Sequence, residues 1–155
     1  MPEPEMFDDL RDLYQEVILD HGRRPRHGQR LEDFDSTAKG DNPMCGDRVQ
    51  VWLKFSPDGT IGRTGFEARG CAISVASADL MAETVQGRSK SDTTALFVAF
   101  REMALTGVCA SCDPALERLA PLSGVHEYPS RVKCATLPWH ALIAALDGTK
   151  ETSSE

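Results

Sequence analysis

The sequence lacks the features that would place this 155-residue chain in a membrane. No apolar run approaches the roughly 18 residues of a transmembrane helix. The start of the chain, Met-Pro-Glu-Pro-Glu, has neither the basic flank nor the apolar core of a signal peptide. We therefore expect a cytoplasmic protein that has no membrane partner.

The chain also lacks an excess of positive charge. Its formal net charge is −7, which argues against broad binding to nucleic acid. Basic residues are dense only at Arg23, Arg24 and Arg26, where a solvated loop or a protein contact is expected. Hydrophobic residues make up 41% and charged residues 26%, as in ordinary globular proteins. Without a repeat or a second boundary, the sequence predicts one domain over residues 1–155, with flexible tails at 1–5 and 148–155.

Five cysteines cannot all pair with one another in disulfides. In a reducing compartment, thiols are better explained by metal binding or by sulfur chemistry. The cysteines are therefore the residues from which a function can be inferred.

The first half of the chain predicts one helix followed by strands. Apolar residues recur at helical spacing over residues 7–21. Alternating residues predict a half-buried strand over 49–55, and the turn Ser-Pro-Asp-Gly leads to a return strand over 61–69. Ile61 is out of phase with this strand, which suggests a bulge, and a short edge strand is expected near 35–38. The sheet is thus expected to be small and antiparallel.

The second half of the chain is expected to be helical. Helical spacing and stop signals predict helices at residues 72–86, at 92–105, at 114–119 and from about 134 to 146. Residues 120–130 are rich in turn formers and read as a linker. The fold class is therefore α+β, a small antiparallel sheet packed against several helices.

Three cysteines lie at the boundaries of predicted elements. Cys45 lies in the turn Asn-Pro-Met-Cys-Gly-Asp, Cys71 follows Gly70 at a strand-to-helix junction, and Cys134 lies beside a helix start. Each alone is also compatible with a packing thiol. Together with Asp47 they supply three sulfur ligands and one oxygen ligand, a set that fits tetrahedral zinc.

Such a site would carry negative charge. Three thiolates and one carboxylate around Zn²⁺ sum to about −2, so a cation is expected nearby. Arg131 and Lys133 flank Cys134 and are candidates, although solvent-exposed charge explains them equally well.

Four motifs together resemble the U-type iron–sulfur assembly proteins, the family that includes SufU, IscU and the NifU N-terminal domain. They are Leu-Tyr-Gln-Glu-Val-Ile-Leu-Asp-His at 13–21, Asn-Pro-Met-Cys-Gly-Asp at 42–47, Gly-Cys-Ala-Ile-Ser-Val-Ala-Ser-Ala at 70–78, and Arg-Val-Lys-Cys-Ala-Thr-Leu-Pro-Trp at 131–139. The resemblance covers about residues 7–147. It implies a three-stranded antiparallel sheet packed against helices.

Two departures point to the SufU branch of this family. Lys133 stands where scaffold members of the IscU type have a histidine, and those members lack a long segment that here spans about residues 106–128. The resemblance to SufU implies a zinc-dependent sulfurtransferase with Zn²⁺ held by Cys45, Asp47, Cys71 and Cys134. It also implies that Cys45 accepts persulfide sulfur from a pyridoxal-phosphate cysteine desulfurase and passes it toward a downstream iron–sulfur scaffold.

Two other functions remain open at this point. The same four ligands could assemble a transient [2Fe–2S] cluster, because thiolates bind both metals. A structural zinc module that only regulates a desulfurase is the third reading.

Cys109 and Cys112 form a lone Cys-x-x-Cys pair to which the resemblance assigns no function. Packing thiols, a redox or sulfur relay, and metal ligands are the alternatives. A second zinc knuckle is not expected, since no other Cys-x-x-Cys completes it. Among the histidines, His140 is expected on a helix surface, and His21 and His27 are candidates for contact with a partner.

Overall fold

The computed structural model describes residues 14–43, 46–108, 114–148 and 151–153. An N-terminal helix includes residues 14–23. The later elements are β1 (Ser36–Asn42), β2 (Asp47–Phe55), β3 (Ile61–Arg69), α2 (Ala72–Thr84), α3 (Lys90–Thr106), α4 (Pro114–Leu119), the 3₁₀ helix η1 (Ala120–Glu127), α5 (Pro129–Asp147) and β4 (Glu151–Ser153).

The predicted α+β class and its three-stranded antiparallel sheet are confirmed. The strand order is β3-β2-β1-β4, and β1, β2 and β3 pair antiparallel. The register shifts between Lys54 and Phe55, and Phe55 pairs with Ile61, which explains why Ile61 is out of phase. β1 extends to Asn42, well beyond the short strand expected at 35–38. Its last residue, Asn42, pairs with Asp47, the first residue of β2.

A fourth strand was not foreseen. β4 lies in the polar tail, and its residues 151–153 pair in parallel with residues 39–41 of β1. A polar segment of this length carries too little apolar pattern to predict a strand, because such an edge strand forms mainly through backbone hydrogen bonds to an existing edge.

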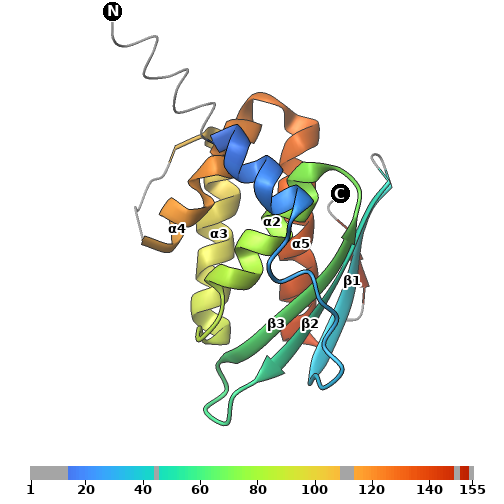
Figure 1. The fold of residues 1–155 in the computed structure, drawn as a ribbon. Helices are drawn as coiled ribbons and strands as arrows, with labels where there is room; N and C mark the ends of the chain where they lie inside the picture. Colours follow the sequence, from blue (N-terminus) through green and yellow to red (C-terminus); the bar gives the residue numbers. More distant parts are fainter. Residues whose placement is uncertain (1–13, 44–45, 109–113, 149–150, 154–155) are drawn as a thin grey trace, which may run out of the picture.

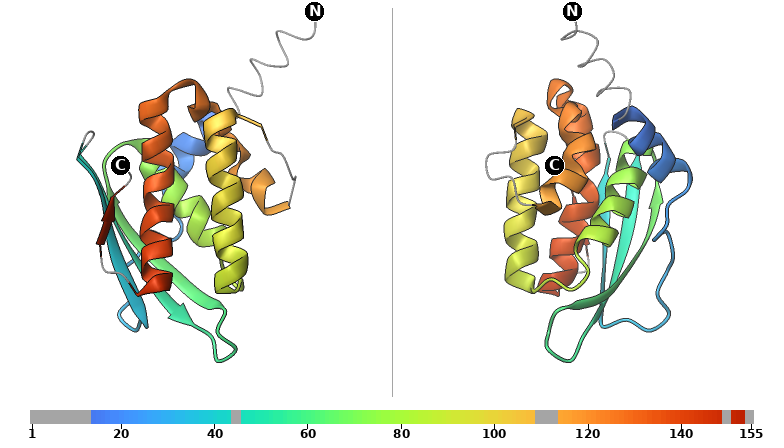
Figure 2. Two further views of the ribbon diagram at one scale, coloured as in Figure 1. Left: turned by 180° about the vertical axis from the view of Figure 1, so that it is seen from behind. Right: turned by 60° about the vertical axis from the view of Figure 1, so that its left-hand side comes forward.

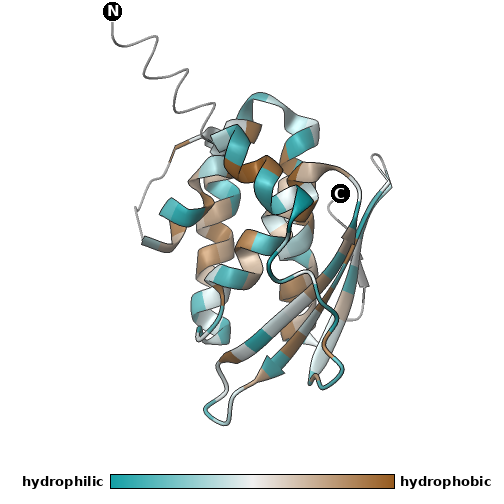
Figure 3. Cartoon of the chain, in the orientation of Figure 1, coloured by the Kyte–Doolittle hydropathy of each residue, from teal (hydrophilic) through white to brown (hydrophobic). Residues whose placement is uncertain are grey.

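Helices α2 and α5 cover one face of the sheet, and α3 lies on the outer side of α5 (Figures 1 and 2). The core between these layers contains Phe100 and Trp139, which are fully buried and stack with ring centroids 4.9 Å apart. Hydrophobic and hydrophilic residues are interspersed along the strands and helices (Figure 3), and most residues of α2 are buried.

The opposite face of β2 is covered by a loop. Trp52 alternates with the buried Val51 and Leu53 along β2, yet it is only 1% exposed. The Arg30 guanidinium lies 5.6 Å from its ring centroid. The same loop packs closely on the neighbouring strand β3, because a Cβ at Gly65 would lie 2.2 Å from the carbonyl of Gln29. Period-two alternation could not reveal this second cover, because it comes from a distant segment.

The expected linker at 120–130 is instead structured. Residues 120–127 form η1, whose Pro121, Leu122 and Val125 are buried. α5 begins at Pro129, so Cys134 lies in the second turn of the helix and not at its start as predicted. Proline at the first helical position is favourable, because its missing N–H has no helical partner there.

The N-terminal helix and the residues that follow it contact α2. His21 Nδ1 contacts the carboxylate of Asp79, which is fully buried, and the backbone N–H of His27 donates to Asp79 Oδ1 at 2.8 Å. Gly22 packs against Ala72, where an added Cβ would meet the Ala72 carbonyl at 3.0 Å. Of the two histidines that were candidates for contact with a partner, His21 uses its ring and His27 its backbone N–H to contact Asp79 within the chain. Among the described residues, no helix combines the length and apolarity needed to cross a bilayer.

Candidate metal centre

Asp47, Cys71 and Cys134 meet at one end of the sheet. One carboxylate oxygen and the two sulfur atoms all lie within 4.8 Å of one another. Asp47 begins β2, Cys71 precedes α2, and Cys134 lies within α5. Three groups that are far apart in the sequence are therefore close enough to share one metal ion.

Cys71 is held at the junction between β3 and α2, as the sequence predicted. It is the N-cap of α2 and is half-buried. The preceding Gly70 has φ 138°, and a Cβ there would lie 2.0 Å from Asp47 Oδ1. Glycine is required at this position, because a side chain would be strained and would also displace the carboxylate.

The Asp47 carboxylate is buried and accepts several hydrogen bonds. Its Oδ1 accepts from the backbone N–H of Cys71 at 3.0 Å, and its Oδ2 accepts from Ser74 Oγ at 2.9 Å. Burial opposes ionisation, but hydrogen bonds from the Cys134 thiol and from these two donors keep the pKa of Asp47 below its ordinary value. The carboxylate is thus ionised in the metal-free cluster.

Cys134 is fully buried, and its Sγ lies 3.5 Å from the carbonyl of Ser130. Burial raises the pKa of this thiol, and the hydrogen bond to Asp47 and the charge of Cys71 raise it further. In the metal-free protein the Cys134 thiol therefore keeps its proton. A metal must displace that proton in order to bind the sulfur.

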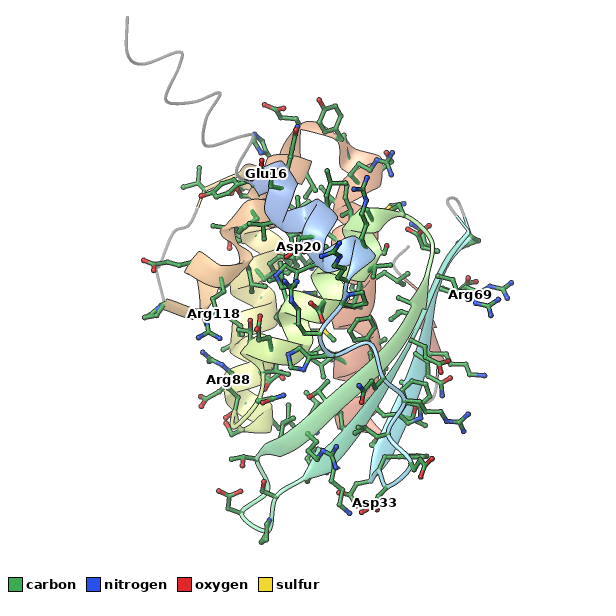
Figure 4. All side chains as sticks on the ribbon, viewed as in Figure 1. Glu16, Asp20, Asp33, Arg69, Arg88 and Arg118 are labelled. Carbon is green, nitrogen blue, oxygen red and sulfur yellow. The ribbon has the colours of Figure 1, made fainter. Side chains whose placement is uncertain are left out.

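Arg131 is the cation beside the two thiols. The Cys71 and Cys134 thiols, when ionised, raise the pKa of its guanidinium, so this candidate from the sequence does lie next to the cluster. Lys133 is half-buried in the same helix. Arg69, at the end of β3, is exposed and points away from the helices (Figure 4).

The donor set fits a thiophilic metal. Two sulfur donors and one carboxylate oxygen on a buried surface match the ligands of zinc and are also compatible with iron. The fourth predicted ligand, Cys45, lies outside the described residues, as do Cys109 and Cys112. The Gly46 N–H donates to the Asn42 carbonyl at 2.8 Å.

The sequence analysis missed the role of Ser74 and Gly70, although both lie within a quoted motif. Ser74 follows Cys71 by three residues, a spacing that places both on one side of a helix start.

His140 is half-buried, and its ring packs edge-on against Phe97 with centroids 5.2 Å apart, so it is not the surface residue expected. It does not belong to the ligand cluster found among the described residues.

The fold and the cluster define a class, namely small α+β proteins with a candidate thiolate–carboxylate metal centre at one end of an antiparallel sheet. The chain belongs to the family described as the NifU-like N terminal domain, whose model matches residues 13–135.

Three known proteins are similar to this chain over most of its length. An "Iron-sulfur cluster assembly scaffold protein IscU" from Streptococcus pyogenes is 38% identical, covering 88% of this chain and 84% of that protein. A "Zinc-dependent sulfurtransferase SufU" from Bacillus subtilis is 35% identical, covering 86% and 88%. A crystal structure of a putative scaffold protein for the SUF system from Fervidobacterium islandicum has a TM-score of 0.76 at 32% identity, covering 84% and 94%. These identities do not confirm that the chain is closer to SufU than to IscU.

Proposed function

We propose that this protein is a zinc-dependent sulfur carrier for iron–sulfur cluster assembly. The observation that carries this proposal is the convergence of Asp47, Cys71 and Cys134 within 4.8 Å. Two relatives named for iron–sulfur cluster assembly and for zinc-dependent sulfur transfer support it.

Cys45 is the proposed sulfur acceptor and the fourth ligand. It precedes Asp47 by two residues, so the chain cannot carry it far from the cluster. Its thiolate attacks the outer sulfur of a persulfide on a cysteine desulfurase. A sulfur–sulfur bond forms on Cys45 as the partner's sulfur–sulfur bond breaks, and the partner's cysteine leaves as a thiolate.

Bound zinc would keep the cysteine ligands deprotonated at neutral pH. The chain's own residues prepare the site for this. Asp47 is already ionised, and Arg131 supplies positive charge beside Cys71 and Cys134. That charge favours the thiolate forms of the cysteines and attracts the anionic persulfide of a partner.

The sulfur-transfer branch is favoured by two features of the chain. The resemblance implies that Lys133 stands where IscU-type scaffolds have a histidine, so no imidazole is offered at this position. The segment that the resemblance assigns to the SufU branch contains α4 and η1, whose Leu116, Leu119 and Leu122 are buried in the core. This segment is a packed part of the fold, next to the pocket of about 450 Å³ that Ile73 and Arg131 help to line.

An assembly scaffold for a [2Fe–2S] cluster is the second candidate, because the same donor set accepts iron. Two measurements separate the candidates. Elemental analysis of protein purified without added metal is expected to give about one zinc per chain and no visible absorbance. Visible absorbance from a stable cluster after anaerobic reconstitution, with no sulfur transfer, would favour the scaffold.

Persulfide mapping tests the acceptor. After mixing with a desulfurase and labelled cysteine, labelled sulfur is expected on Cys45, and Cys45→Ala is expected to abolish its acceptance. Undiminished stimulation of the desulfurase by the Cys45→Ala variant would remove Cys45 from this role.

A further inference from the structure

Ser74 is a buried serine that contacts every member of the described cluster. Its Oγ lies 2.9 Å from Asp47 Oδ2 and 3.7 Å from Cys71 Sγ. The same oxygen lies 3.0 Å from the backbone carbonyl of Cys134. Ser74 is only 1% exposed, so water does not compete for these contacts.

A proline explains the contact with the backbone of Cys134. In an α-helix, the carbonyl of residue 134 accepts a hydrogen bond from the N–H of residue 138. Residue 138 is Pro138, which lies inside α5 and has no N–H to donate. The Ser74 hydroxyl on α2 donates to this carbonyl instead and ties the turn that carries Cys134 to the start of α2.

The hydroxyl therefore has two acceptors and one proton. Asp47 Oδ2 and the Cys134 carbonyl lie at nearly equal distances, 2.9 and 3.0 Å. A serine hydroxyl rotates about its C–O bond and donates its single proton to either oxygen. Whichever acceptor it serves, the buried donor of Ser74 stays satisfied.

We infer that Ser74 is a positioning residue that orients the Asp47 carboxylate for metal binding in the cluster. With its proton on Asp47 Oδ2, Ser74 holds the carboxylate toward the thiols. With its proton on the Cys134 carbonyl, Ser74 instead ties α5 to the start of α2. This inference rests on the proposed function in one respect, that the cluster binds a metal.

Ser77 provides a matched control. It lies three residues further along α2, it is also fully buried, and its Oγ donates to the carbonyl of Ala135 at 2.5 Å. This hydrogen bond is to the backbone of α5 and not to Asp47. Ser77→Ala therefore removes the same hydroxyl from the same helix interface and leaves the carboxylate in place.

The test compares Ser74→Ala with Ser77→Ala in the full chain, using Zn²⁺ affinity and the visible spectrum of the Co²⁺-loaded protein. Ser74→Ala is expected to lower the affinity by about 10–100-fold, the usual effect of removing a partner that orients a ligand. It is also expected to shift the Co²⁺ bands. Ser77→Ala should leave both nearly unchanged, and equal losses in the two variants would overturn the inference.

The Asp47→Ala background shows whether Ser74 acts through the carboxylate. Without Asp47, Ser74→Ala is expected to cause little further loss of affinity, because the group that it orients is gone. A loss as large as in the wild-type background would mean that Ser74 only supports the fold and would contradict the inference.

A metal-free measurement separates this inference from the proposed function. If the wild-type protein bound neither Zn²⁺ nor Co²⁺, the proposed function would fail on its own. In the metal-free chain, Pro138→Ala gives residue 138 an N–H for the Cys134 carbonyl. Ser74→Ala should then shift the urea midpoint less than it does in the wild type. An equal shift in both backgrounds would show that Ser74 does not serve this carbonyl.

Discussion

The metal-binding end of the sheet and the apolar core beside it are built from the same elements, yet they depend on the sequence in different ways. The core residues of β2, α2 and α5 recur with the period of each element, and other apolar residues of similar volume could replace many of them. The cluster depends on single residues, such as Gly70 beside Asp47 and Ser74 between two ligands. Core variants should therefore change stability, whereas cluster variants should change metal binding.

The largest effect is expected in the core, from Phe100→Ala. Phe100 is fully buried and stacks on Trp139, so the cavity left by its ring should lower the free energy of unfolding by about 3–5 kcal/mol. Urea unfolding of the metal-free protein measures this loss. Zn²⁺ affinity, measured where the variant is still folded, should stay close to wild type. Loss of metal binding by the folded variant would contradict the separation of the two regions.

Cys71→Ala is the corresponding change at the cluster. Removing a ligand should cost more than the roughly 100-fold upper range for residues that only orient ligands, or over about 2.7 kcal/mol of binding energy. Sulfur transfer should be lost with the metal. Cys71 is half-buried, so unfolding of the metal-free protein should change little.

Cys109→Ala and Cys112→Ala are the controls for this loss. Both should keep about one zinc per chain, because the four-residue site needs neither thiol. Zinc content that falls in these variants as it does in Cys71→Ala would add the Cys-x-x-Cys pair to the metal site.

Gly70→Ala should affect both regions at once. The left-handed φ of 138° and the 2.0 Å approach to Asp47 Oδ1 predict a destabilisation of about 1–3 kcal/mol together with weaker Zn²⁺ binding. Gly59→Ala is the matched control, since Gly59 also has a positive φ but faces open space. It should lower stability slightly and leave metal binding unchanged. Equal metal affinity in both variants would show that the carboxylate tolerates displacement.

The smallest effect concerns pH. Hydrogen bonds lower the pKa of Asp47 in the folded protein, so its ionised form stabilises the fold above the unfolded pKa of about 4. That contribution should disappear as the pH falls from about 4 through the lower pKa of the folded state. In metal-free protein, Asp47→Asn should lose less stability than wild type over this range in urea unfolding. Parallel pH profiles would show that Asp47 is not held in its ionised form.

Local patterns predicted much of this structure. The alternation of apolar and polar residues predicted the strands β2 and β3. Turn and helix-start signals placed Cys71 between β3 and α2. The start of α5 was placed too late, because turn-forming residues hid the helical start at Pro129. The covered face of Trp52 escaped prediction for a different reason, since a loop distant in sequence packs over it.

The sequence by itself determined which residue types could bind a metal and which elements would carry them, because ligand chemistry and the period of side chains are local properties. Only the tertiary structure decided that Asp47, Cys71 and Cys134 meet within 4.8 Å and that Arg131 lies beside the two thiols. It also decided that Ser74 bonds both to a carboxylate on β2 and to a carbonyl on α5. Such contacts depend on how three elements pack together, and no spacing along one chain segment specifies that packing.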